Sequence, residues 1–323
     1  MLRLRSLAVL AGLILPAAQA AAHGVCGPRI FVSTLTIDDP AVADEASLPT
    51  FAWTRDGSDG GKGPTLNYDF DFEFAKRITP DFGLSLGYGF SVANQLSGKS
   101  GKGSTDFGWH NLELNAKYAK CVDATHQLML AFGITREFGS TGTLRMDAAR
   151  YGTTTPTLYF GKGFGDIGVD ALRPLALTGT FAYAISDVSL KRLPNGAGNG
   201  GDFNQGAEHQ WQGGLSLQYS LPYLQSQVKD MGLPEWIGRL TPLVEFSWSS
   251  PATAPRATPT QMLLAPGVVY NGDWYQLGIE ALIPLNRATG RNVGLIAQFH
   301  VYLDDLLPNS LGKPIFSAPL FGK

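Results

Sequence analysis

The chain has 323 residues and a formal net charge of −2, and 16% of its residues are charged. A weakly acidic chain without a basic patch is not expected to bind nucleic acid. The 39 glycines and the low share of charged residues are typical of an all-β protein with many turns. We expect no cofactor and no metal ion.

The first residues predict a signal peptide, residues 1–22. Arg3 and Arg5 precede a short apolar run at 7–15, and small residues follow it. The run is too short to cross a bilayer comfortably, and its alanine-rich exit offers cleavage sites. The mature chain is therefore expected to be exported, with residues 23–46 as an N-terminal periplasmic segment.

Residues 65–74, TLNYDFDFEF, alternate between apolar and polar side chains. Successive side chains of a strand point to opposite faces, so Phe70 and Phe72 share one face and Asp69 and Asp71 the other. Similar alternation recurs along the chain and predicts about twelve strands. We place them at 47–55, 65–77, 82–94, 109–122, 127–138, 155–164, 174–186, 209–220, 241–249, 261–271, 273–285 and 292–303.

The connections between these strands alternate between two kinds. Tight turns lie near residue 80, at 123–126 and at 271–272, and longer polar connections lie at 56–64, 95–107, 139–153 and 187–208. Short turns at one end and long loops at the other are typical of outer-membrane barrels. The connection 221–240 is long but falls on the short-turn side, where a short amphipathic helix with Leu224, Val228 and Met231 on one face is expected.

These patterns predict an all-β fold, a closed antiparallel transmembrane barrel of about twelve strands over residues 47–304. Residues 305–323 would form a C-terminal periplasmic tail. A closed barrel in lipid gives every apolar face a partner and leaves no unpaired strand edge. A secreted soluble β fold is the alternative.

Two stretches carry a resemblance to a known group. TLTIDDPAVADEASLPTF (34–51) and LDDLLPNSLGKPIF (303–316) resemble Gram-negative outer-membrane barrels of the transporter-like or MetA-pathway phenol-degradation type. The resemblance implies an outer-membrane location and a barrel form. It implies no catalytic residues.

The polar strand faces would point into the barrel lumen. The expected lumen-facing residues are Asn67, Asp69, Asp71, Glu73, Asn111, Glu113, Asn115, Lys117, Glu245, Gln276, Glu280, Gln298 and His300. Acids outnumber bases in this set, which favours a channel for small solutes, cationic or aromatic ones among them. The alternative is a plugged barrel in which the same groups pair with one another, because twelve strands lie between filled and open barrel sizes.

The remaining candidates concern aromatic, cysteine and histidine side chains. Aromatic residues near predicted strand ends are expected to form an interfacial girdle, or else a stacking site for an aromatic solute; they are Tyr68, Trp109, Trp211, Trp248, Trp274 and Tyr275. Cys26 and Cys121 are expected to form a disulfide at the periplasmic mouth, because the exported chain meets an oxidising compartment. No G-x-S-x-G pattern accompanies the histidines, so we expect no enzyme, a lipid hydrolase being the least favoured alternative. The expected partners are membrane lipid and small solutes.

Overall fold

The computed structural model describes residues 24–57, 62–99, 101–144, 146, 148–188, 208–252 and 259–321. The expected signal peptide and most of the connection 187–208 lie outside these residues. Among the described residues, no helix has both the length and the apolar character needed to cross a membrane.

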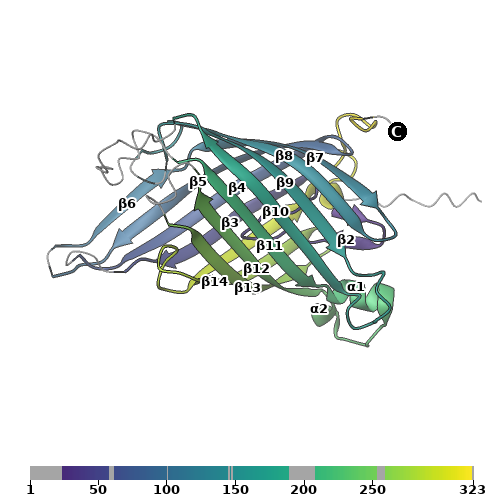
Figure 1. Cartoon of the computed structure of the whole chain (residues 1–323). Coiled ribbons are helices and arrows are strands. Elements are labelled where there is room, and N and C mark those ends of the chain that lie inside the picture. The colour runs from purple at the N-terminus through teal and green to yellow at the C-terminus, as the bar shows by residue number, and fades with distance from the viewer. Residues whose placement is uncertain are drawn as a thin grey trace, which may run out of the picture.

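A single closed antiparallel sheet dominates the structure (Figure 1). Its strands are β3 (Glu45–Arg55), β4 (Thr65–Thr79), β5 (Phe82–Gln95), β6 (Ser104–Trp109), β7 (Leu112–Asp123), β8 (Leu128–Phe138), β9 (Thr153–Gly163), β10 (Leu175–Ser186), β11 (Gln210–Tyr219), β12 (Leu240–Pro251), β13 (Gln261–Asn271), β14 (Tyr275–Pro284) and β15 (Gly294–Tyr302). Apart from β6 and β7, strands that follow one another in the chain pair, and the pairing of β15 with β3 closes the ring.

Strands β6 and β7 occupy one position in the ring. Both pair with β5, and only His110 and Asn111 separate them. The sheet is therefore a twelve-stranded barrel, which confirms the predicted fold class. The predicted loop 95–107 is shorter than expected, because residues 104–109 extend the pairing with the end of β5.

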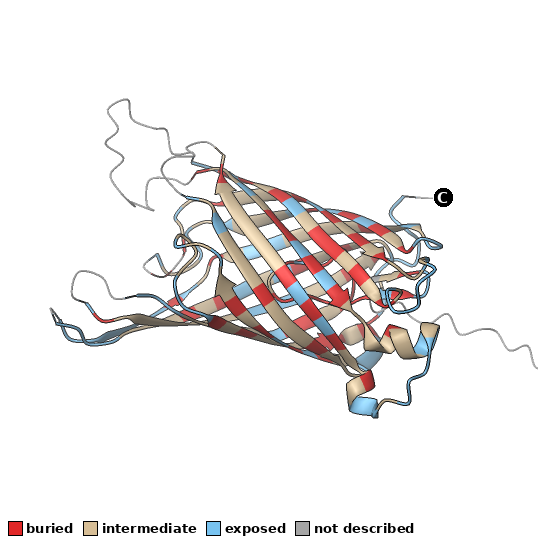
Figure 2. Ribbon diagram, turned by 60° about the horizontal axis from the view of Figure 1, so that its bottom comes forward, coloured by how far each residue is buried: buried red, intermediate tan, exposed pale blue. Residues whose placement is uncertain are grey.

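Side chains alternate between the two faces of the barrel wall. Large apolar side chains on the outer face are exposed, for example Phe132 at 49% and Phe181 at 50%. Their neighbours in the chain, such as Ala131 and Ala182, are buried against the interior. Figure 2 shows buried and exposed positions alternating along the strands. Most of the outer face is therefore an exposed apolar surface, although Phe321 of the C-terminal tail packs against Tyr118 with ring centres 5.1 Å apart.

The two ends of the barrel differ in their connections. At the end that we call the turn end, tight turns follow β4, β7 and β13, and the termini of the described chain lie nearby (Figure 1). This end also carries α1 (Leu221–Tyr223), the π-helical turn η1 (Leu224–Val228), α2 (Glu235–Gly238) and α3 (Leu303–Leu306). The opposite end, where β3, β5 and β8 finish, is called the loop end.

The amphipathic helix expected in the connection 221–240 is only partly present. The side chain of Ser220 accepts a hydrogen bond from Tyr223 N and caps α1, but the helical turns stop at Lys229, whose backbone is extended. Met231 therefore lies beyond the helix and is 53% exposed, so its expected place on the packed face was wrong.

A small hairpin of β1 (Gly24–Cys26) and β2 (Arg29–Phe31) lies at the turn end. Cys26 forms a disulfide with Cys121 at the end of β7, with a Cα–Cα distance of 5.2 Å, as predicted. The fully buried guanidinium of Arg29 donates to the carbonyl oxygens of Arg173 and Pro174, and lies 3.7 Å from the centre of the Tyr223 ring. The disulfide and these contacts fix the hairpin to the barrel.

Residues 32–44, which we call the plug, lie inside the barrel. Leu35 packs in an apolar cluster with Leu243 and Val269 of the barrel wall. The plug also packs closely against wall positions that are occupied by glycine. A Cβ at Gly214 would lie 2.2 Å from Ile37 Cγ2, and one at Gly278 would lie 2.5 Å from Leu35 Cδ1, so neither position has room for a side chain. The segment 23–46 was expected at the periplasmic mouth, and the structure adds that much of it enters the lumen.

The plug ends in an ionic cluster that joins both ends of the described chain. Asp44 accepts hydrogen bonds from Arg77 Nε at 2.8 Å and from Lys76 Nζ at 2.6 Å. Arg77 also contacts the Asp304 carboxylate at 3.2 Å and donates to the carbonyl of Gly312 at 3.0 Å. The C-terminal tail is thereby held against the plug and β4.

Candidate functional site in the barrel interior

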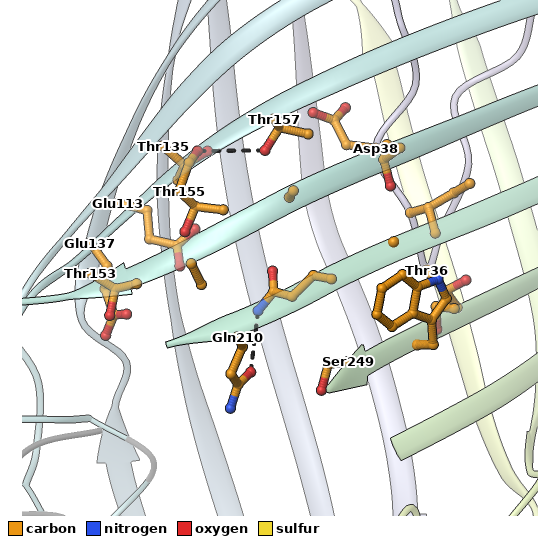
Figure 3. A pocket seen from close by; sticks show the side chains of 18 of the residues that line it. Thr36, Asp38, Glu113, Thr135, Glu137, Thr153, Thr155, Thr157, Gln210 and Ser249 are labelled. Carbon is orange, nitrogen blue, oxygen red and sulfur yellow. Dashed lines mark hydrogen bonds between the residues drawn. The ribbon is translucent and has the colours of Figure 1, made fainter. Parts of the chain in front are cut away.

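Two adjoining cavities occupy the interior, a wide one between the plug and the loop end and a small one beside the plug. The wide cavity has a volume of about 880 Å³ and the small cavity about 440 Å³. Both are bordered by Asp38 of the plug and by Glu73 and Glu113 of the wall. Figure 3 shows Glu113, Glu137 and Thr153 at one end of the wide cavity, and Asp38 and Thr36 at the other.

Three wall carboxylates lie in one row across neighbouring strands. Glu73 lies opposite Gly87, Gly87 lies opposite Glu113, and Glu113 lies opposite Glu137. Directly opposed residues have Cβ atoms about 5 Å apart, so Glu113 and Glu137 are close neighbours. We call Glu73, Glu113 and Glu137 the acidic row. Glu73 and Glu113 are both exposed, and both border the two cavities, so their side chains are accessible from inside the barrel.

The acidic row is not balanced by lysine or arginine. The wide cavity is bordered by five carboxylates, those of Asp38, Glu73, Glu113, Glu137 and Glu208. No lysine or arginine of the described chain borders either cavity. Carboxylates crowded in a passage with low-dielectric walls produce a negative potential that concentrates cations.

The plug neutralises other interior charges. Lys117 forms an ion pair with Asp38 at 2.7 Å and donates to the carbonyl oxygen of Asp39 at 3.0 Å. Its ammonium also lies 4.6 Å from the centre of the Tyr159 ring. The predicted lumen residue Lys117 therefore holds the plug and is not a free charge in the passage.

Three further predicted lumen residues meet or underlie the plug. Glu245 accepts hydrogen bonds from the backbone N–H and the hydroxyl of Thr36 at 2.6 and 2.5 Å. Gln276 donates to the carbonyl of Ser33 at 2.7 Å and accepts from the Tyr302 hydroxyl at 2.7 Å. Glu280 is 1% exposed and interacts with Glu245. These carboxylates are buried and face no open passage.

The predicted residues near the loop end take part in wall and loop contacts. Asn67 donates to Asp56 at 2.9 Å, and Asp69 accepts from Ser91 at 2.5 Å. Asn111 donates to Glu137 at 2.7 Å and accepts from the backbone N–H groups of Thr141 and Gly142, which anchors the loop that follows β8.

Two predicted residues on β15 and one on β7 border the cavities. Gln298 and His300 border the small cavity, where Gln298 donates to Thr50 at 2.9 Å. His300 lies 3.1 Å from both Ser47 Oγ and Glu45 Oε2. Asn115 borders the wide cavity, and its Oδ1 atom has no hydrogen-bond partner in the described part of the chain.

A serine, a histidine and an aspartate connect in the order of a catalytic triad. Ser91 Oγ lies 2.5 Å from His110 Nε2, and His110 Nδ1 lies 2.9 Å from Asp71 Oδ1. Ser91, however, is 2% exposed, borders neither cavity, and donates its hydroxyl proton to Asp69. A nucleophile must reach its substrate and pass its proton to the histidine. The geometry instead fits a network in which His110 links two carboxylates.

The acidic row continues into uncharged polar side chains on the next strands. Thr153 of β9 lies directly opposite Glu137, and Thr155, Thr157 and the β11 residues Gln210 and Gln212 also border the wide cavity. Among the described residues, no group of three or more His, Cys, Asp or Glu side chains is placed to hold a metal ion. The wide cavity is thus bordered by carboxylates and by uncharged hydrogen-bonding side chains.

Several of these cavity residues were missed by the sequence analysis. Glu137 follows the alternation of residues 127–138 and shares the face of Thr135, so its position could have been found. Asp38 and Glu208 lie outside predicted strands, and strand alternation offers no signal for them.

Most of the predicted aromatic residues contact other aromatic rings, and Trp248 is also among the residues that border the wide cavity. Trp109 stacks on Tyr88 with ring centres 5.3 Å apart, and Trp211 lies 4.4 Å from Tyr183. Further pairs join Trp248 to Phe181 and Trp274 to Tyr275. Trp109, Trp211 and Trp274 remain about two-fifths exposed, at 41%, 42% and 39%.

No protein-family model matches the chain, and no curated protein matches it. Among solved structures, the chain is similar to the KdgM porin, with 9% identity, a TM-score of 0.43 and coverage of 79% of this chain and 98% of that one. The NanC porin gives 12% identity, a TM-score of 0.45 and coverage of 79% and 98%. The transport unit of the autotransporter AIDA-I from Escherichia coli gives 11%, 0.44, and 84% and 93%. At these values, the function must be argued from this chain's own residues.

Proposed function

We propose that the protein is an outer-membrane channel that admits small cationic and polar solutes from the loop end. The observation that carries the proposal is the charge of the interior: five carboxylates border the wide cavity, and no lysine or arginine among the described residues does. An acidic passage attracts cations and repels anions.

The location is supported by the outer face. Its exposed leucine, phenylalanine and tryptophan side chains suit a lipid solvent, and every strand of the closed sheet except the short β6 has two neighbours. The aromatic pairs of the outer face suit a position near the headgroups. The turn end, which carries both termini of the described chain, would face the periplasm.

Cysteine labelling tests the location and the orientation. Ser104→Cys places a thiol at the loop end, and Asp230→Cys places one in the exposed connection at the turn end. An impermeant thiol reagent added to intact cells should label the first and spare the second. The reverse pattern would invert the orientation, and labelling of neither in the membrane fraction would contradict it.

Reversal potentials under a salt gradient test the function. The native barrel in a planar bilayer should prefer cations, and Glu113→Gln combined with Glu137→Gln should move the reversal potential toward zero. Glu235→Gln is the matched control, because Glu235 lies on α2 outside the cavities. An anion-selective native pore, or a selectivity that the double variant leaves unchanged, would refute the proposal.

A plugged barrel that serves as an interaction platform is the second candidate. The observation that favours it is the plug, which contacts β7 through Lys117, β12 through Glu245 and β14 through Gln276. The two candidates differ in what happens when the plug is loosened. A channel gains conductance in a Leu35→Ala variant, whereas a platform stays silent in both forms.

A further inference from the structure

We propose that the wide cavity is a binding site for organic polycations, compounds that carry two or more ammonium groups on a flexible frame. The inference rests on the proposed function and names the class of solute that it would admit. Three observations carry it: the acidic row, a separate buried carboxylate, and the size of the cavity.

The separate carboxylate is Glu208, which precedes β11 on the side of the cavity away from the acidic row. Glu208 is 7% exposed and borders the wide cavity, and its Oε2 atom has no hydrogen-bond partner in the described part of the chain. A buried carboxylate oxygen without a donor is costly. An ammonium group in the cavity would supply the missing donor.

The unpartnered atoms that border the wide cavity are acceptors. Besides Glu208 Oε2, the amide oxygen of Asn115 is buried without a partner in the described part of the chain. A matching ligand must therefore be rich in donors and positively charged. An ammonium group meets both requirements, since it carries three N–H donors and no acceptor.

The spread of the carboxylates favours several cationic groups in one molecule. The acidic row extends over β4, β7 and β8, whereas Glu208 lies beside β11. A volume of about 880 Å³ is within the range of sites for organic ligands and far exceeds a single ion. Among the described residues, no three or more His, Cys, Asp or Glu side chains come together closely enough to hold a metal ion. The threonines of β9 would meet the frame of the ligand and its water.

Spermidine is a suitable probe because its ammonium groups are spread along a flexible chain. Calorimetry on the purified full chain in detergent should detect spermidine binding at low salt and no binding of the neutral polyol sorbitol. Glu113→Gln combined with Glu137→Gln should weaken binding about tenfold or more, as expected for lost charged hydrogen bonds. Glu208→Gln should weaken it severalfold by removing the opposite contact, and Glu235→Gln should leave it unchanged.

Competition separates a polyamine site from a general attraction for cations. Excess magnesium chloride, matched in charge to spermidine, should displace it only weakly. Complete displacement by magnesium, or equal binding by the native chain and the Glu113 and Glu137 double variant, would overturn the inference. Should the double variant fail to fold, Glu208→Gln alone keeps the test decisive.

Binding and conduction fail independently. Spermidine binding in detergent with no conductance in bilayers would refute the channel and leave the polycation site intact. Cation-selective conductance without spermidine binding would refute the polycation site and leave the channel intact.

Discussion

The part of the lumen that the plug fills, which we call the plugged half, and the part that the wide cavity occupies, the cavity half, give inward-facing charged residues different surroundings. In the plugged half, the interior cations are matched: Lys117 pairs with Asp38, and Arg77 pairs with Asp44 and Asp304. In the cavity half, the acidic row faces solvent-accessible space without lysine or arginine among the described residues. Inward polar residues of this barrel are therefore bound into the structure where the plug meets them and stay accessible from the cavity where it does not.

The disulfide offers the largest perturbation of the plugged half. Cys26→Ser with Cys121→Ser removes a crosslink between residues separated by 95 positions. Loss of such a crosslink should lower the free energy of unfolding by about 2 to 5 kcal/mol, mainly through the unfolded state. Urea unfolding of the folded barrel in detergent measures the change. A double variant as stable as the native chain would show that the hairpin contacts of Arg29 suffice.

Leu35→Ala should loosen the plug without altering the cavity half. Truncation of a buried leucine typically lowers the free energy of unfolding by about 2 to 5 kcal/mol. Because Leu35 belongs to the plug, most of this loss should weaken the docking of the plug to the barrel wall. Hydrogen exchange of residues 32–44 should rise steeply while the strands stay protected. Leu158→Ala, at a 51% exposed position of the outer face, is the matched control. Equal exchange in both variants would show that Leu35 does not hold the plug.

Lys117→Gln should leave a carboxylate of the plugged half without its cationic partner, as the carboxylates of the acidic row already are. The Asp38 side chain is 51% exposed, so loss of this ion pair should cost the docked plug only about 1 kcal/mol. Asp38 would then add an unmatched carboxylate to the wide cavity, and cation preference should increase. Reversal potentials measure this, with Lys162→Gln as the control, because Lys162 pairs with Asp166 in a turn. A decreased preference would contradict the charge argument.

The smallest expected effect concerns pH and the C-terminal tail. Burial raises the pKa of Asp304 to about 7 from 3.8, although the nearby Arg77 opposes the shift. The folded state therefore binds more protons than the unfolded state between these values, so this contribution to stability is lost as pH rises from about 4 to 7. Asp304→Asn should flatten the pH dependence of unfolding in this window. An unchanged slope would show that Asp304 titrates normally.

Strand alternation anticipated the barrel well because the period of two is a local property of the chain. The twelve predicted segments coincide with the barrel strands to within a few residues, apart from the extension through β6. The disulfide followed from compartment and turn placement. The plug could not be predicted in this way, because it depends on contacts distant in sequence, such as Ile37 against Gly214 and Thr36 against Glu245.

The attachment of the plug at both ends has a consequence for how often it could block the lumen. One end is tied to β7 through Cys26, and the other continues directly into β3 at Glu45. A plug that leaves the lumen therefore stays near the mouth, at an effective concentration on the order of millimolar for a short tether. Re-entry is a first-order event that dilution of the protein does not slow. If the barrel conducts as proposed, its closed and open periods should therefore be independent of how many copies share a membrane.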